Sequence, residues 1–356
     1  MESEAFYSAL DILRGLISRP SFSRDEAAAA DFLTEVLTLH GQPVGRKGNN
    51  VYVIPQTFRP EKPTILLNSH IDTVRPVAGW TRNPFLPDND DVSSDRIYGL
   101  GSNDAGASLV ALYAAFRRIT LAPQPSNFIF LASAEEEVSG SGGVESVIGE
   151  LPAIAFGLVG EPTGMHPAIA ERGLMVLDCE AVGRAGHAAR DEGVNAIDIA
   201  VADIGRLHSC RFPLVSPLLG HVKTTVTVIH AGEQHNVIPD RCRFTVDVRS
   251  NGLYSNDELC RMIAERLQSE VAPRSLRLNA SHISVEHPFV KRAVLLGRQP
   301  FGSPTLSDQA LMPFPTVKMG PGESARSHTA NEFVLISEIR EAIEIYVRLL
   351  SGLALE

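Results

Sequence analysis

Short runs of apolar residues alternate with helical patterns over most of the chain. The runs have strand length and are VYVI at 51–54, TILLN at 64–68, NFIFLAS at 127–133, AIAFGLV at 153–159 and TVKM at 316–319. Helical spacing of apolar residues occurs in the first forty residues, at 107–119 and at 336–350. Continuous hydrophobicity indicates strands that are buried on both faces. The pattern therefore predicts an α/β domain with a mostly parallel sheet flanked by helices.

The pattern changes between residues 173 and 282. The segments LMVLDCEAV, KTTVTVIHA, RCRFTVDVR and SLRLNASHI are expected to be strands, and apolar and polar residues alternate in them. Helical patterns at 196–207 and 258–267 give the order β, α, β, β, α, β, which is that of a ferredoxin-like α+β domain. We therefore expect residues 173–282 to form a domain inserted into a first domain made of residues 1–172 and 283–356.

Length, charge and cysteine content narrow the class of protein. The 356 residues are too many for one ordinary core and agree with two domains. The net charge of -10, with scattered basic residues, argues against a nucleic-acid partner. No apolar run approaches the roughly 20 residues of a membrane span, and the acidic start is unlike a signal peptide. We expect a cytoplasmic protein without a membrane partner, in which the four separated cysteines are reduced thiols.

Side chains able to bind a metal follow four of the predicted parallel strands. His70 and Asp72 follow TILLN, the glutamates at 135–137 follow NFIFLAS, Glu161 follows AIAFGLV, and His328 follows TVKM after a Gly-Pro-Gly loop. In open α/β sheets, ligands bind at the carboxyl ends of the strands. We therefore expect these side chains to form one cluster.

Capping of helices is an alternative interpretation of each acid taken singly. Asp104 in GLGSNDAGAS stands just before a predicted helix, where Asp is favoured as a cap. Three adjacent carboxylates repel one another, however, and capping needs only one or two, so a nearby cation would account for the rest. His70 and Asp72 are two positions apart, so in extended chain they point to one side and Asp72 can orient the imidazole.

Eight short segments resemble, in their order, the signature of the M20 metallopeptidases. They are NSHIDTV, YGLGSNDAGAS, SAEEEVSGSGG, VGEPT, GRAGHAA, NVIPD, DVR and SHTANE, and they span nearly the whole chain. Each motif alone is weak, whereas eight in the right order are specific. The resemblance implies a zinc-peptidase-like catalytic domain, with the inserted domain acting as a lid and as the contact surface of a homodimer.

The resemblance also implies a site for two zinc ions, for which Co²⁺ or Mn²⁺ could substitute. The implied ligands are Asp104 as the bridge, His70 and Glu161 for one ion, and Glu137 and His328 for the other. Ligands limited to His and carboxylate suit zinc.

The family's Asp-Glu-Glu motif aligns with SAEEEV and implies that Glu136 is the general base. Glu136 would accept a proton from the attacking water and pass it to the leaving amine. Asp72 would orient His70. A shift of one residue, which makes Glu135 the base and Glu136 the ligand, is an alternative.

Further site residues are carried over from the family. His187 of GRAGHAA would reach the partner subunit's active site, although alone it could be an ordinary His in a Gly-rich turn. Asn236 of NVIPD and Arg249 of DVR match substrate-binding positions, and an Arg fork suits an α-carboxylate. Arg249 could equally be a salt-bridged strand residue. Arg326 precedes His328 closely enough to contact the substrate, and Asp308 lies in a segment similar to a pocket-lining loop.

The implied activity is removal of an N-acyl group from a small-molecule amino acid, with N-acetylornithine of arginine biosynthesis as the expected substrate. N-succinyl-diaminopimelate, N-acyl-citrulline and dipeptides are alternative substrates. Relatives commonly have a Lys shortly after the bridging Asp, whereas AGAS follows Asp104 here, which leaves the subfamily open. A catalytically silent metabolite-binding protein would be a different class, and it predicts a missing base or ligand.

Overall fold

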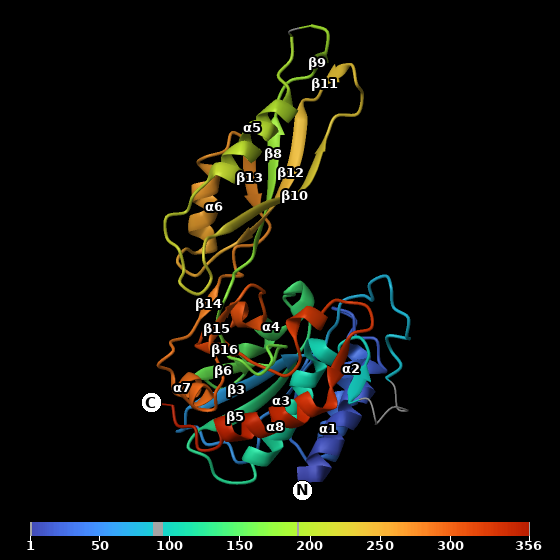
Figure 1. Ribbon diagram of the computed structural model, residues 1–356, viewed down its shortest axis with the longest axis vertical. Coiled ribbons are helices and arrows are strands. Elements are labelled where there is room, and N and C mark those ends of the chain that lie inside the picture. Colours follow the sequence, from blue (N-terminus) through green and yellow to red (C-terminus); the bar gives the residue numbers. More distant parts are fainter. Residues whose placement is uncertain (1, 88–94, 191, 356) are drawn as a thin grey trace. The chain divides into compact units, whose positions relative to one another are not determined.

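The chain folds into two compact units in the computed structural model, which describes residues 2–87, 95–190 and 192–355 (Figure 1). The larger unit contains the described residues up to Ile169, with His282–Phe301 and the described residues from Ser307 onward. The smaller unit contains Ala170–Ser281 and Gly302–Leu306. The sequence did not anticipate the second of these segments, which includes part of strand β15 (Phe301–Ser303).

A nine-stranded sheet organises the larger unit. Its strand order is β1-β2-β5-β3-β6-β16-β7-β14, with β15 beside β7. The strands other than β15 are β1 (Val44–Lys47), β2 (Asn50–Val53), β3 (Thr64–His70), β5 (Asn127–Ser133), β6 (Phe156–Val159), β7 (Ala168–Glu171), β14 (Ser281–His282) and β16 (Thr316–Lys318). The four central strands β5, β3, β6 and β16 are parallel, whereas β1 and β2 are antiparallel additions. The predicted α/β class with a mostly parallel sheet is confirmed.

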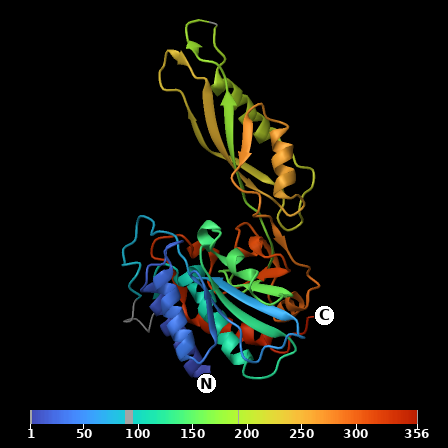
Figure 2. The same ribbon diagram turned by 180° about the vertical axis from the view of Figure 1, so that it is seen from behind.

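Helices cover both faces of this sheet (Figures 1 and 2). They are α1 (Glu2–Ile17), α2 (Ala27–Leu39), α3 (Ala107–Ile119), α4 (Val144–Ile148), α7 (Pro288–Leu295) and α8 (Ile336–Leu350). Phe128 and Phe130 of β5 belong to the core formed with α1, α3 and α8, whereas Ile129 and Leu131 belong to the core formed with α4. Both sets of side chains are buried, which explains why β5 is continuously apolar.

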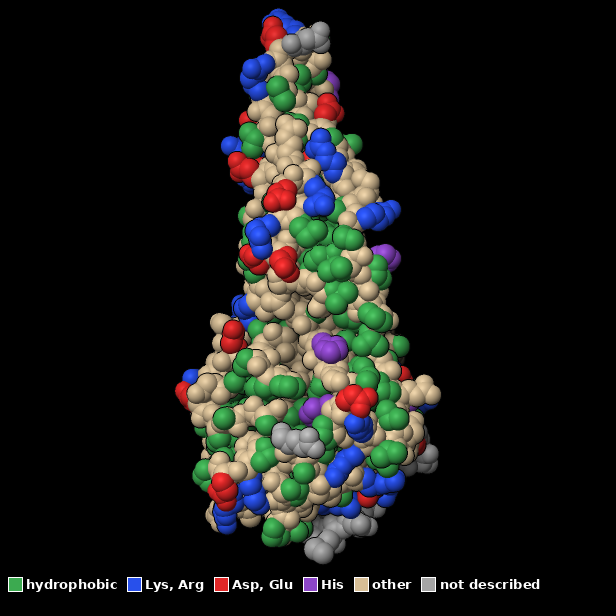
Figure 3. Space-filling model, turned by 90° about the vertical axis from the view of Figure 1, so that its left-hand side faces the viewer, with side chains coloured by type: hydrophobic (Ala, Val, Ile, Leu, Met, Phe, Trp, Pro, Cys, Tyr) green, Lys and Arg blue, Asp and Glu red, His purple; other side chains and the backbone are tan. Residues whose placement is uncertain are grey.

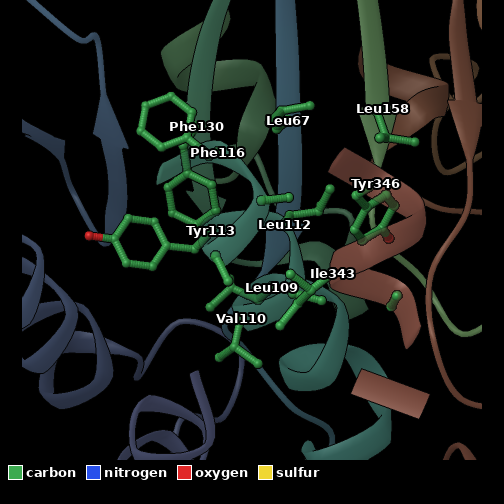
Figure 4. Close-up of a cluster of buried hydrophobic side chains, with 14 of the residues drawn as sticks. Leu67, Leu109, Val110, Leu112, Tyr113, Phe116, Phe130, Leu158, Ile343 and Tyr346 are labelled. Atoms are coloured by element: carbon green, nitrogen blue, oxygen red, sulfur yellow. The ribbon is translucent and has the colours of Figure 1, made fainter. Parts of the chain in front are cut away.

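The core between the sheet and helices α3 and α8 is drawn in Figure 4. Leu112 and Phe116 of α3 lie between Phe130 of the sheet and the side chains of α8. Tyr346 of α8 is buried here, and its hydroxyl donates a hydrogen bond of 2.6 Å to the backbone oxygen of Met319. This bond attaches α8 to the chain just beyond β16, where the segment that carries His328 begins.

A short antiparallel ribbon joins two segments that are distant in sequence. Strand β4 (Arg96–Tyr98) pairs with β17 (Phe333–Leu335). A single irregular helical turn at Ser102–Gly106 follows β4, and the peptide bond between Asp104 and Ala105 is cis. The ribbon therefore brings the turn that contains Asp104 close to the loop that contains His328.

The smaller unit has the predicted ferredoxin-like order. Its antiparallel sheet runs β10-β12-β8-β13, built from β8 (Met175–Val182), β10 (Lys223–Ala231), β12 (Arg241–Arg249) and β13 (Glu270–Pro273). Helices α5 (Ala196–Ser209) and α6 (Asn256–Ala264) contribute buried residues to its core. A separate ribbon pairs β9 (Gly186–His187) with β11 (Val237–Ile238).

One strand of the smaller unit was predicted at the wrong place. The sequence favoured SLRLNASHI at 275–283, but the fourth strand of the sheet is β13 at 270–273 and only 281–282 of the predicted segment is extended in a strand. Strand β13 ends at Pro273, which has no N–H to continue the ladder. Leu276 and Leu278 are buried or partly buried without strand pairing, so their apolar character reflects packing.

Among the described residues, no helix combines the length and the hydrophobicity that crossing a membrane requires.

Candidate metal centre

Six side chains with nitrogen or carboxylate donors lie together at the carboxyl ends of the parallel strands. They are His70, Asp104, Glu136, Glu137, Glu161 and His328. Single donor atoms of His70, Glu136 and Glu161 lie within 4.8 Å of one another, and so do donor atoms of His70, Asp104 and Glu137. Strand β3 ends at His70, and β5 and β6 end shortly before the glutamates. Parallel strands thus place the donors at one edge of the sheet.

Asp104 lies between the two histidines. Its Oδ1 is 3.2 Å from Nε2 of His70, and its Oδ2 is 3.6 Å from Nε2 of His328. Nε2 of His328 is also 3.0 Å from a carboxylate oxygen of Glu137. One carboxylate therefore presents an oxygen to each of two groups of donors, which is the arrangement that a pair of bridged cations requires.

Glu161 has a buried acceptor without a partner. Its Oε1 makes no hydrogen bond within the described part of the chain and lies 3.6 Å from Nε2 of His70. A buried acceptor is costly to leave unpaired, and a cation between Glu161 and His70 would satisfy it. Two imidazoles and four carboxylates are donors that divalent zinc accepts. The residues present therefore fit a pair of divalent cations.

The pKa values reflect the crowding of acids around His70. Burial raises the pKa of Glu136 well above its usual value, and burial together with the charge of Asp104 raises the pKa of Glu161 to about 8. Burial would lower the pKa of His70, but hydrogen bonds with Asp104 and Asp72 raise it well above its usual value. The hydrogen bond with Glu137 raises the pKa of His328 to about 9. The carboxylates therefore compete for positive charge.

Asp72 holds the site in a way that the sequence did not predict. Nδ1 of His70 lies 2.9 Å from the backbone oxygen of Asp72 and 3.5 Å from its carboxylate, so the backbone makes the closer contact. The carboxylate accepts the backbone N–H groups of Glu136 and Glu137, at 3.0 and 3.1 Å, and the hydroxyl of Ser23 at 2.7 Å. Asp72 therefore orients the imidazole and also fixes the turn that carries two of the glutamates.

Glu135 differs from its two neighbours in its contacts. Its carboxylate accepts the N–H of Gly142 at 3.4 Å and lies 3.7 Å from the guanidinium of Arg24. Its backbone has a positive φ of 56°, and its N–H donates to the buried carboxylate of Glu26. Glu135 therefore tethers the glycine-rich loop after it, which favours the alignment with Glu136 as base and Glu137 as ligand.

Three buried polar residues support the cluster. The sequence placed Asp308 in a segment similar to a pocket-lining loop, and it assigned no role to Asn103 or Glu332. Oδ2 of Asp308 accepts the side chains of Asn68 in β3 and Ser133 in β5, at 2.8 and 2.6 Å, and so joins the ends of two strands. Asn103 and Glu332 are hydrogen-bonded to the loops that carry Asp104 and His328. Asn103 and Glu332 lie inside the motifs GLGSNDAGAS and SHTANE, so the motifs pointed to them without indicating their contacts.

The remaining candidates are occupied by other contacts or lie in the smaller unit. His187 and Asn236 adjoin on the β9/β11 ribbon, where the backbone N–H of Ala188 donates to the backbone oxygen of Asn236. Arg249 forms a two-pronged ion pair with Asp247 in the smaller unit. In the larger unit, Arg326 forms a similar pair with Glu338, at 2.8 and 3.0 Å. Either arginine would have to leave its acid to bind a substrate carboxylate.

Comparisons with known proteins identify the family and the fold. The profile of Peptidase family M20/M25/M40 matches residues 66–352. Acetylornithine deacetylase from Photorhabdus laumondii is 27% identical over 381 residues, which cover 97% of each chain. Two solved structures share the fold: a tripeptidase from Staphylococcus aureus (TM-score 0.76, 21% identity, 97% of each chain) and a dinuclear metal-binding peptidase of family M20 from Bacillus subtilis (TM-score 0.72, 17% identity, 98% of each chain). The predicted family resemblance is confirmed.

Substitutions in the acidic triplet test the assignment of base and ligand. We expect Glu136→Ala to keep two bound ions and to lower kcat by about 10²- to 10⁴-fold, the usual contribution of a general base. Glu137→Ala should lose one ion, because its carboxylate contacts His328. Glu135→Ala is the matched control and should keep both ions and most of the activity. Elemental analysis measures the bound metal of the three variants, and hydrolysis assays measure their activity. Retention of both ions by Glu137→Ala, with loss of one ion by Glu136→Ala, would show that the alignment is shifted by one residue.

The buried carboxyl of Asp308 predicts a pH dependence of stability. Burial raises the pKa of this carboxyl to about 6 in the folded chain, above the usual value of an aspartate. A raised folded pKa means that Asp308 stabilises the fold when protonated, and that this stabilisation is lost as the pH rises from about 4 through 6. The side chain of Asp308→Asn cannot ionise. In chelator-treated protein, the melting temperature of this variant minus that of the wild type should therefore be larger at pH 7.5 than at pH 4.5. A difference that is the same at both pH values would contradict this.

Proposed function

Because this chain belongs to peptidase family M20, whose members hydrolyse amide or peptide bonds, we propose that it removes the acyl group from the α-nitrogen of an amino acid. The proposed substrate is N-acetylornithine, a metabolite of arginine biosynthesis, and the proposed cofactors are two zinc ions. The position of Asp104, with one oxygen toward each histidine, carries the two-ion proposal. Similarity to acetylornithine deacetylase over nearly the full length supports the choice of substrate.

Each proposed role follows from the surroundings of the residue. His70 and Glu161 would hold one ion, Glu137 and His328 the other, and Asp104 both. Bound divalent cations supply Lewis acidity, which lowers the pKa of water and polarises the scissile carbonyl.

Glu136 is the proposed base and acid of the reaction. It lies beside His70 and Glu161, and its raised pKa suits a group that must take a proton from water and release it to the leaving amine. The amide C–N bond breaks as the carbonyl carbon gains the oxygen of water, and the amine leaves with the transferred proton.

We also propose that the chain acts as a homodimer joined through the smaller unit. Strand β10 is at the end of its sheet and pairs with β12 on one side. Val228 and Ile229 of β10 are 42% and 48% exposed. An unpaired edge with exposed apolar side chains is a surface that a second copy can extend by symmetric pairing.

On the face in Figure 3, basic side chains lie among acidic ones, which supports a small-molecule substrate over a nucleic-acid partner.

His187 is proposed to act on the substrate held by the other subunit. Its Nδ1 accepts the backbone N–H of Ala189 at 3.1 Å, so the neutral ring carries its proton on Nε2. The ring is exposed, and an Nε2–H donor can stabilise the negative oxygen that develops as the amide carbonyl is attacked.

A substrate panel tests the reaction class. Acetyl, succinyl and formyl derivatives of ornithine, citrulline, diaminopimelate and methionine, together with dipeptides, are assayed with added zinc or cobalt. We expect the highest kcat/KM for N-acetylornithine. Preference for a dipeptide would indicate a peptidase. Stoichiometric metal without turnover of any compound would indicate a metabolite-binding protein.

Complementation between inactive variants tests the role of His187. His187→Ala and Glu136→Gln should each be inactive alone, whereas mixed dimers contain one site with both residues intact. Random exchange of subunits should therefore restore about a quarter of the wild-type activity, because half of the dimers are mixed and each mixed dimer has one working site of two. No recovery after verified subunit exchange, or a fully active monomer in light-scattering measurements, would contradict the proposal.

A further inference from the structure

Two buried polar side chains connect the segments that carry Asp104 and His328 without belonging to the donor cluster. They are Asn103, which precedes Asp104, and Glu332, which follows the His328 loop. The two residues are 0% and 2% exposed. We call this pair the clamp.

Glu332 holds the backbone around Asp104. Its Oε1 accepts the N–H groups of Asn103 and Asp104 at 2.8 and 3.0 Å, and its Oε2 accepts the N–H of Gly101 at 3.2 Å. Three backbone donors converging on one buried carboxylate fix the conformation of the turn. The residue beside the His328 loop therefore sets the position of Asp104.

Asn103 makes the reverse connection. Its Oδ1 accepts the N–H of Glu323 at 3.1 Å, and its Nδ2 donates to the backbone oxygen of Glu323 at 3.1 Å and to the hydroxyl of Ser327 at 3.2 Å. Ser327 also hydrogen-bonds the carboxylate of Asp104. Gly322 permits this approach, because a Cβ there would lie 2.2 Å from Oδ1 of Asn103. The residue beside Asp104 therefore fixes the chain leading to His328.

The two histidines of the site differ in how much they need such support. The side chain of His70 is 1% exposed and lies at the end of a central strand, where neighbouring strands and Asp72 hold it. The side chain of His328 is 50% exposed, on a loop residue with a positive φ of 57°. His328 therefore depends on the contacts of its loop for its position relative to Asp104 and Glu137.

We propose that Asn103 and Glu332 are positioning residues that set the affinity for the second ion, the one held by Glu137 and His328. This inference rests on the proposed two-ion site. The clamp fixes Asp104 and His328 relative to each other, so an ion that needs both is bound by preorganised ligands. The ion held by His70 and Glu161 depends on the clamp only through Asp104.

Metal titration of Asn103→Ala tests the proposal against a matched control. Asn127 is also buried in the larger unit, accepts the N–H of Arg59 at 2.9 Å, and donates to the backbone oxygens of Arg59 and Lys62 at 2.7 and 3.1 Å. It lies at the opposite end of β5 from the donor cluster. Asn127→Ala therefore removes a similar set of bonds without touching the clamp.

The measurement is isothermal titration calorimetry of chelator-treated protein with Zn²⁺, with circular dichroism to verify folding. In Asn103→Ala we expect the Kd of the weaker equivalent to rise by about 10- to 100-fold, as for other residues that support metal ligands, while the tighter equivalent changes less. Because the weaker site is then less occupied, the kcat measured at limiting zinc should fall. It should recover at excess zinc, with KM little changed. Asn127→Ala should bind both equivalents as the wild type does.

Variants of Glu332 provide a second, graded test. Glu332→Gln retains a side-chain oxygen for the N–H groups of Asn103 and Asp104, so it should weaken the second ion less than Glu332→Ala does. Wild-type affinity for both ions in folded Asn103→Ala and Glu332→Ala, or equal weakening by Asn127→Ala, would overturn the clamp. Two-ion binding by a protein that hydrolyses no acylated amino acid would refute the proposed reaction and leave the clamp test intact.

Discussion

Mutual repulsion among buried carboxylates is the constraint on which the site depends. Asp104, Glu136 and Glu161 share the surroundings of the buried imidazole of His70. Removing carboxylates from water is costly unless each is paired, and one imidazolium cannot pair with all of them. The two divalent cations proposed for this site would supply the missing charge. The fold brings these acids together, because the carboxyl ends of parallel strands lie at one edge of the sheet.

The donor cluster is held by further acids that lie just outside it. Asp72 accepts two backbone N–H groups of the glutamate turn, Glu332 accepts three from the Asp104 turn, and Asp308 accepts side chains of β3 and β5. Each outer carboxylate is satisfied by donors of the protein, so it would not compete for the proposed cations. Burial raises the pKa values of Asp308 and Glu332 to about 6 and about 8, so their charged forms remain unfavourable in the folded chain. The hydrogen bonds that make the site rigid therefore come with a free-energy cost of burying these carboxylates.

Sequence alone located the parallel strands and the candidate ligands because both depend on local features. Strands buried on two faces must be continuously apolar, as in β5, and their polar ends must converge. The contacts of Asn103 and Glu332 could not be predicted in this way, because they join segments more than 200 positions apart and most of them end on backbone groups, which carry no sequence signal. The ion pairs of Arg249 and Arg326 likewise depend on acids whose proximity only the fold determines.

The acidic triplet illustrates how environment gives adjacent identical residues different chemistry. The carboxylate of Glu135 turns to Gly142 and Arg24, whereas that of Glu137 contacts His328. Glu136 lies between these two in the sequence, near His70 and Glu161, where burial raises its pKa well above the usual value. A base for hydrolysis must bind a proton when water is attacking and lose it when the amine departs, so its pKa must be tuned by surroundings that can change during the reaction. The backbone N–H groups of Glu136 and Glu137 donate to Asp72 and fix the turn that carries both side chains, and so the proposed difference in their roles depends on a carboxylate outside the triplet.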